Sequence, residues 1–277
     1  MSHSPRTIAS GFAYPEGPRW HDGLLWFSDQ HEGSVFALDP AGHVRDRFTV
    51  PGGPSGLGWL PNGDLLVISM EDRLLLRRRP SGELTVHADL KSVHPSYSND
   101  MIVDASGRAY AGNVGFNFYT GEAPRTTCIA AIAPDGSVSI AADDLSLPNG
   151  SVITPDGKTL IVAETMGFRL TAFDIDADGG LSNRRLFADL GQHAPDGICL
   201  NSNGDVWVAV PWAQTVMLVR AGGEIVAQVP IENGNPYACM LGGEDGRDLY
   251  ICCAPDHSPE NTLRLRGGRI DVIREPI

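Results

Sequence analysis

Two stretches of the chain share one pattern: a polar residue, a glycine, an apolar run and a turn. Asn149 carries the pattern in "LPNGSVITPDGKTLIVAE", and Asp196 carries it in "APDGICLNSNGDVWVAV". Amide and carboxylate oxygens are the ligands that hard divalent cations prefer, above all Ca²⁺. The repeated pattern therefore predicts metal-assisted chemistry, provided that the fold brings the two copies together.

Equivalent positions occur in four other segments. All six lie seven to nine residues before a turn glycine, and these glycines recur every 40 to 50 residues, at Gly23, Gly63, Gly107, Gly157, Gly204 and Gly246. The positions, called the axial ring below, are Glu16, Ser55, Asn99, Asn149, Asp196 and Tyr237. Every one of these side chains offers oxygen, and none is His or Cys. Two carboxylates in a narrow space repel each other, and a divalent cation cancels their charge.

A structural interpretation of the same residues is open. Polar residues before glycine are common in turns, where they cap strands or bind water. One Asn-Gly pair alone would favour that interpretation, whereas four oxygen donors in register across six repeats favour a metal site. We expect one ion, Ca²⁺, with Zn²⁺, Mn²⁺ or Mg²⁺ as alternatives.

The repeats also predict the fold that positions these residues. Each turn glycine precedes a strand-like apolar run, and a second turn follows in every unit, which gives four antiparallel strands per unit. Six such units predict an all-β six-bladed β-propeller, with the first strand of each blade lining the central channel. The last unit ends soon after its third strand, around 269–273, and the N-terminal segment around 6–10 is expected to supply the fourth. A pair of β-sandwiches is the alternative, but it gives no reason for a period near 45 residues. We treat residues 1–277 as a single domain.

Composition narrows the class of protein. The net charge of −13, from 21 basic and 34 acidic residues, argues against nucleic-acid binding. The sequence shows neither a signal peptide nor an apolar stretch long enough to span a membrane. The five cysteines show no metal-binding spacing and are expected to be free thiols in a reducing cytoplasm. The expected partner is a small-molecule substrate, and a closed ring predicts a monomer or a weak homo-oligomer.

Several motifs together resemble the senescence-marker-protein (regucalcin)/gluconolactonase family of six-bladed propeller lactonases. They are "YPEGPRW", "SNDMIVDASGRAYAGN", "LPNGSVITPDGKTL", "APDGICLNSNGDVWVAV" and "YACMLGG", and the similarity extends over essentially the whole chain. The resemblance implies a divalent metal held by Glu16, Asn149 and Asp196. It implies that Asn99 contacts the substrate or completes the metal shell, and that Asp196 is the acid/base residue.

The sequence departs from the sugar-lactone members at two positions. Tyr97 stands where they carry an arginine, and Asn117 stands where they carry a glutamate. Both departures remove charge that would hold a polyhydroxylated ring, so we expect a substrate less polar than gluconolactone. The expected substrate-binding residues are Asn99, Asp100, Tyr97, Asn117, Phe116 and Trp212, with Phe118 and Tyr119 nearby in sequence. The alternative is that the aromatic residues pack among themselves in a surface loop.

The preferred hypothesis is metal-dependent hydrolysis of a lactone. Asp196 would act as a general base on water or as a nucleophile, and the sequence leaves both routes open. The same site is also compatible with phosphoester hydrolysis, carbonyl hydration or isomerisation, because a fold does not fix a reaction. A non-catalytic calcium-binding propeller is the alternative from another class.

The other reactive side chains give weaker evidence of a catalytic role. Ser55 lies in "GPSGLG", which is not the motif of a serine hydrolase. His94, His193 and His257 lie near the expected channel mouth, where a proton shuttle is one interpretation and an ordinary loop histidine the other. Asp29 and Glu164 end second strands, and structural hydrogen bonding is expected for both.

Overall fold

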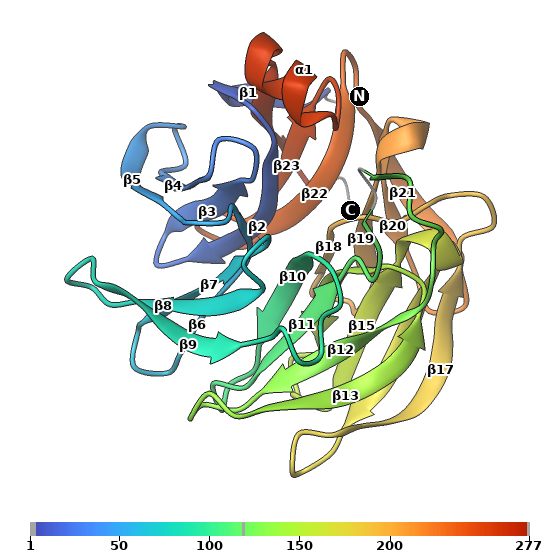
Figure 1. Cartoon of the computed structure of the whole chain (residues 1–277). Helices are drawn as coiled ribbons and strands as arrows, with labels where there is room; N and C mark the ends of the chain where they lie inside the picture. Colours follow the sequence, from blue (N-terminus) through green and yellow to red (C-terminus); the bar gives the residue numbers. More distant parts are fainter. Residues whose placement is uncertain (1–3, 118–119, 276–277) are drawn as a thin grey trace.

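The protein folds as a ring of six four-stranded antiparallel sheets around a central axis (Figure 1). The computed structural model describes residues 4–117 and 120–275, so Phe118 and Tyr119 lie outside the described residues. The prediction of an all-β six-bladed propeller with four strands per blade is confirmed.

Blades 1 to 5 are each a meander of four consecutive strands, from the innermost to the outermost. Blade 1 comprises β2 (Pro15–His21), β3 (Leu24–Asp29), β4 (Ser34–Leu38) and β5 (Val44–Thr49). Blade 2 comprises β6 (Pro54–Trp59), β7 (Leu65–Ser69), β8 (Leu74–Arg78) and β9 (Leu84–Asp89). Blade 3 comprises β10 (Ser98–Val103), β11 (Ala109–Asn113), β12 (Thr127–Ile132) and β13 (Val138–Leu145).

Blades 4 and 5 add a short helical turn after the second strand. Blade 4 comprises β14 (Pro148–Ile153), β15 (Thr159–Glu164), β16 (Arg169–Ile175) and β17 (Leu181–Asp189), with the 3-10 turn η2 (Thr165–Gly167). Blade 5 comprises β18 (Ile198–Leu200), β19 (Val206–Val210), β20 (Thr215–Val219) and β21 (Ile225–Pro230), with the 3-10 turn η3 (Pro211–Ala213).

Blade 6 joins the two ends of the described chain. It comprises β22 (Asn235–Gly242), β23 (Asp248–Ala254), β24 (Gly268–Arg274) and β1 (Arg6–Phe12), with α1 (Pro259–Leu265) between β23 and β24. Strand β1 pairs antiparallel with β24, and the Thr7 hydroxyl donates to the Asp271 carboxylate at 2.6 Å. The predicted closure by the N-terminal strand is confirmed (Figure 1). Among the described residues, no helix is both long and apolar enough to cross a membrane.

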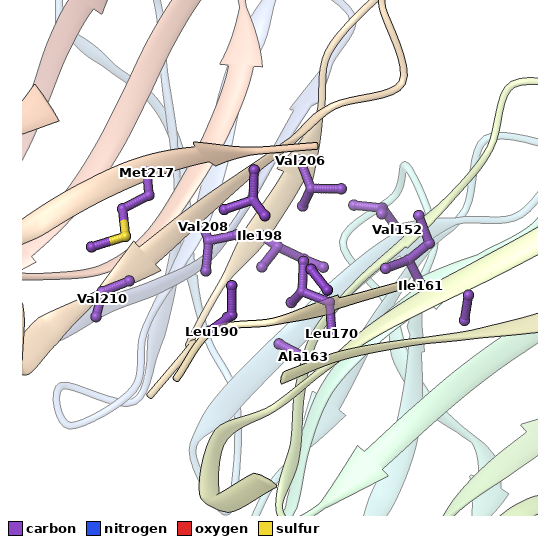
Figure 2. Close-up of a cluster of buried hydrophobic side chains, with 13 residues drawn as sticks. Val152, Ile161, Ala163, Leu170, Leu190, Ile198, Val206, Val208, Val210 and Met217 are labelled. Carbon is purple, nitrogen blue, oxygen red and sulfur yellow. The ribbon is translucent and has the colours of Figure 1, made fainter. Parts of the chain in front are cut away.

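Apolar side chains fill the spaces between blades. Figure 2 shows one such cluster, in which Val152, Ile161 and Leu170 of blade 4 lie against Ile198 and Val208 of blade 5. Both faces of these strands are covered, so their sequences are nearly continuous apolar runs. Burying each large aliphatic side chain contributes about 1.5–3 kcal/mol to the stability of the ring.

Glycines after the axial-ring residues allow the innermost strands of neighbouring blades to meet. A Cβ on Gly150 would lie 2.5 Å from the Ile198 amide nitrogen, and one on Gly197 would lie 2.4 Å from the Ala238 Cβ. Both distances are too short for any side chain, so these positions require glycine. The polar-Gly pattern in the sequence therefore has two causes, since the glycine makes room for the next blade and the residue before it faces the axis.

Candidate metal and substrate site

In four of the six blades, a backbone irregularity includes the axial-ring residue. In blade 4, Pro148 pairs with Glu164 and Ser151 pairs with Val162, so Asn149 and Gly150 together oppose a single residue. Such a β-bulge takes a side chain out of the alternating pattern of the strand and re-aims it. Equivalent register shifts include Ser55 in β6, Asn99 in β10 and Tyr237 in β22. In β2, Glu16 pairs with Ser28 and the shift follows it. Asp196 lies just before β18, where its amide donates to the Ala209 carbonyl at 2.9 Å.

Side-chain hydrogen bonds connect the axial ring across four blades. The Ser55 hydroxyl donates to the Asn99 amide oxygen at 3.1 Å, and the Asn99 amide nitrogen donates to the Asn149 amide oxygen at 3.2 Å. The Asn149 amide nitrogen in turn donates to the Asp196 carboxylate. The structure therefore brings Ser55, Asn99, Asn149 and Asp196 together, as the repeats predict.

Glu16 and Asp196 concentrate negative charge at the axis. Their exposed fractions are 8% and 7%. Burial, together with the charge of Asp196, raises the pKa of the Glu16 carboxyl well above its usual range. Burial and the charge of Asp100 likewise raise the pKa of Asp196, although the Asn149 hydrogen bond opposes this shift. Buried carboxylates that lack compensating charge are costly, so the axis favours a bound cation.

The donor set fits a hard cation. Within the described parts of the chain, no three His, Cys, Asp or Glu side chains cluster as a metal site would require. An ion at the axis would therefore need amide oxygens in addition to the two carboxylates. Glu16, Asp196, Asn149 and Asn99 supply such a set, and all-oxygen donors suit Ca²⁺ better than Zn²⁺.

Asp100 occupies a different environment from the one expected of a substrate-binding residue. Its carboxylate accepts a hydrogen bond from the Met101 amide at 2.8 Å and forms an ion pair with Arg19 at 3.2 Å. Arg19 comes from blade 1 and Asp100 from blade 3. The pair thus joins two blades that are not neighbours. Asp100 is not among the described residues that line the cavity near the axial ring.

A cavity of about 310 Å³ lies over the axial ring. Asn99, Asp196 and Tyr237 line it from the innermost segments of their blades, so the ring reaches the cavity directly. Loops that lead into first strands and loops that follow second strands provide the walls. These wall residues include Tyr14, His31, Met70, Tyr97, Val114, Leu147, Trp212 and His257.

Predicted substrate residues divide between the cavity and its surroundings. Tyr97 and Trp212 line the cavity, and Trp212 is 67% exposed. Phe116 is buried and, like Asn117, is not among the described lining residues. The Asn117 amide donates to the Glu122 carboxylate at 2.7 Å.

His31 is a cavity residue that the sequence analysis missed. Its ring stacks on Tyr14 with centroids 4.5 Å apart, and its Nδ1 lies 2.6 Å from the Thr262 hydroxyl of α1. Burial, with a contribution from the charge of His257, lowers the pKa of His31 to about 4. His31 stands two residues after the end of a second strand, as Trp212 does, and that shared position is the signal that would have identified it.

The other histidines and two carboxylates fall in separate environments. His257 lines the cavity, whereas His94 is fully buried with Nδ1 2.8 Å from the Ser98 hydroxyl. His193 is not among the described lining residues. Asp29 accepts hydrogen bonds from the amides of Ala13, Tyr14 and Glu32, and Glu164 accepts bonds from four groups, so the expected structural role of both is confirmed.

The fold and the site define a six-bladed propeller with an oxygen-rich axial site beneath a cavity. Residues 14–255 match the family described as the SMP-30/Gluconolactonase/LRE-like region, and the chain belongs to this family. Regucalcin from Xenopus laevis is 26% identical over 262 residues, which cover 92% of this chain and 87% of the relative.

Two solved structures share the fold. The calcium-binding protein regucalcin from Agrobacterium tumefaciens superposes with a TM-score of 0.83 at 24% identity, covering 98% of this chain and 94% of the other. A gluconolactonase from Xanthomonas campestris gives a TM-score of 0.76 at 22% identity, covering 99% and 96%. At these identities the likeness establishes the architecture, and the chemistry must be argued from the site.

Proposed function

We propose that the protein is a divalent-cation-dependent hydrolase of a lactone less polar than gluconolactone. One observation carries the proposal: Asp196 belongs to the buried acidic axial ring and also lines the cavity. A carboxylate in both places can touch a bound substrate and an ion at the same time. The family, which includes gluconolactonases among its structures, supports an ester-like substrate.

The residues have distinct roles in this proposal. Glu16, Asn149 and Asp196 would hold the ion, and Asn99 would complete its shell or contact the substrate. When bound there, Ca²⁺ would supply Lewis-acid polarisation of the lactone carbonyl. Asp196 accepts a proton from the attacking water, the water oxygen bonds to the carbonyl carbon, and the ring C–O bond breaks. The proton then passes to the departing alkoxide, giving the open hydroxy acid. Direct attack by Asp196 is the alternative first step.

The cavity lining supports an uncharged and rather apolar substrate. Four aromatic side chains, from Tyr14, Tyr97, Trp212 and Tyr237, line the cavity. No Lys or Arg is found among its described lining residues, so a carboxylated or phosphorylated ligand would meet no ammonium or guanidinium group there. The partner we propose is therefore a neutral small molecule.

A non-catalytic calcium-binding role is the second candidate, because the relative from Agrobacterium tumefaciens is described as a calcium-binding protein. A protein that only binds an ion has no use for a cavity of about 310 Å³ over that ion.

We also place the protein in the cytoplasm, where the five cysteines, all free and buried, would stay reduced.

Proton release at constant pH, measured with a panel of lactones, tests the proposal. The panel runs from aldonolactones to alkyl and aromatic γ- and δ-lactones, and each is assayed with native protein, after chelation, and after adding back Ca²⁺, Zn²⁺, Mn²⁺ or Mg²⁺. We expect turnover that depends on the ion and is fastest with apolar lactones. Ion binding without hydrolysis of any lactone would refute the hydrolase and favour the second candidate.

A further inference from the structure

A buried ion pair joins blade 1 to blade 3 next to the axial ring. The Arg19 guanidinium contacts the Asp100 carboxylate at 3.2 Å and donates to the Met101 carbonyl at 2.5 Å. It also donates to the Pro18 carbonyl at 2.8 Å. Arg19 lies three residues after Glu16 on β2, and Asp100 directly follows Asn99 on β10. The pair therefore lies beside the expected ion ligands.

With an ion bound and the carboxyls ionised, the charges of the protein at the axis can be summed. The carboxylates of Glu16, Asp100 and Asp196 contribute −3, and Arg19 contributes +1, which leaves −2. The side chains of Arg19 and Asp100 are only 13% and 9% exposed, so solvent screens them weakly. Without the pair, Glu16 and Asp196 would give the same sum of −2, but losing either partner alone changes it by one unit.

We propose that Arg19 neutralises Asp100 and so keeps the net charge of the axial site at −2, which matches a divalent cation. The inference rests on the proposed function, because it assumes that the axial ring binds a cation. Asp100 alone would add attraction for any cation and would favour a trivalent one. Arg19 cancels that attraction, so a trivalent ion would leave a buried surplus of positive charge. Arg19 and Asp100 are thus specificity-determining residues that do not touch the substrate.

A purely structural role makes a different prediction. The pair also ties blade 1 to blade 3, so removing either partner should lower stability because the remaining charge is buried without its counterion. Under that interpretation, ion affinity should follow loss of structure and not the sign of the charge that was removed. The two roles separate when both partners are replaced together, because the net charge then returns to −2.

The test measures Ca²⁺ and Tb³⁺ affinity of the full-length, metal-free protein by isothermal titration calorimetry. The variants are Asp100→Asn, Arg19→Met and the double variant, each checked by circular dichroism and thermal unfolding. We expect Asp100→Asn to weaken Ca²⁺ binding on the order of tenfold or more. We expect Arg19→Met to strengthen binding of both ions, with the larger gain for Tb³⁺, and the double variant to return close to the native affinities.

The exposed pair Arg45–Asp39 provides a matched control. These side chains meet at 2.6 Å on the outer part of blade 1, so Asp39→Asn and Arg45→Met make the same charge changes away from the axis. They should leave both affinities unchanged. A double variant that binds no better than Asp100→Asn would overturn the inference, and this comparison decides even if Arg19→Met fails to fold. Native protein that binds neither ion would instead refute the proposed function, and the inference with it.

Discussion

Glu164 and Asp196 are buried carboxylates on neighbouring blades, but their surroundings are opposite. Glu164 is fully buried at the end of β15 and accepts several strong hydrogen bonds. The donors are the Ser146 amide at 2.8 Å, Arg169 at 2.9 Å, the Thr171 hydroxyl at 2.5 Å and Arg184 at 3.1 Å. Asp196 receives a hydrogen bond from Asn149 and lies close to the like charges of Glu16 and Asp100.

The difference shows how two buried acids can be distinguished by function. Burial by itself would raise the pKa of Glu164, but hydrogen bonds from Arg169 and Thr171 outweigh it and hold that pKa below its usual range. Burial raises the pKa of Asp196, and the neighbouring charge of Asp100 adds to the effect. A carboxylate with its donors supplied by the protein stabilises the fold, whereas one left short of donors beside another acid is a candidate for ion binding or catalysis.

The largest expected effect is on activity. Replacing Asp196 with asparagine removes both an ion ligand and the proton acceptor, so lactone hydrolysis should fall by about 10²–10⁴-fold. The assay is the initial rate of proton release at saturating Ca²⁺. Asp205→Asn is the control, because Asp205 is a buried carboxylate of the same blade that pairs with Arg220. Equal losses in the two variants would contradict a specific role for Asp196.

The second effect is on stability. Glu164→Gln leaves Arg169 and Arg184 without their counterion, and because both guanidiniums retain some solvent contact we expect a loss of about 2–3 kcal/mol in the free energy of unfolding. Chemical denaturation measures it. Asp174→Asn, which breaks an exposed ion pair with Arg185, should cost much less than Glu164→Gln, because solvent screens exposed pairs. Neither variant should change the affinity for Ca²⁺. If Glu164→Gln did change it, Glu164 could no longer be distinguished from Asp196 as a purely structural carboxylate.

The smallest expected effect is a change with pH in how much Glu164 stabilises the fold. The pKa of Glu164 is lower in the folded than in the unfolded protein. Its contribution to stability is therefore complete above the unfolded pKa and is lost as the pH falls through the folded value. The difference in melting temperature between native protein and Glu164→Gln should shrink as the pH falls from 6 towards 3. A difference that stays constant over this range would show that the Glu164 charge does not stabilise the fold.

The repeat made the fold and most of the axial ring predictable. Its period predicts the blade count, and the position of Asn149 and Asp196 before a glycine predicts which side chains face the axis. That inference worked because close approach of neighbouring inner strands imposes glycine at Gly150 and Gly197. A Cβ would also be too close to the next blade at Gly17 and Gly56, so the same steric cause leaves a trace in four of the six blades.

Contacts made by residues that occur in only one repeat leave no periodic pattern in the sequence. The Arg19–Asp100 pair depends on the width of the channel and on two residues that have no equivalents in the other repeats. His31 becomes a cavity residue because α1, an insertion found in blade 6, supplies Thr262 to hold it. The sequence predicts Asp100 as a substrate-binding residue, and only the fold shows that its carboxylate pairs with Arg19.

Closure of the ring by β1 also governs when the axial ring can form. The Thr7–Asp271 hydrogen bond joins residues 264 positions apart, and β1 leads directly into the segment that carries Glu16. A nascent chain can complete blades 1 to 5, which carry all the expected ion ligands, in order as it is synthesised. The ring that fixes these ligands around one axis closes only after β24 has emerged and paired with β1. Contacts of such long sequence separation form slowly. Folding intermediates should therefore have five formed blades in an open arc and weak cation binding, and a rise in cation affinity should report closure of the ring.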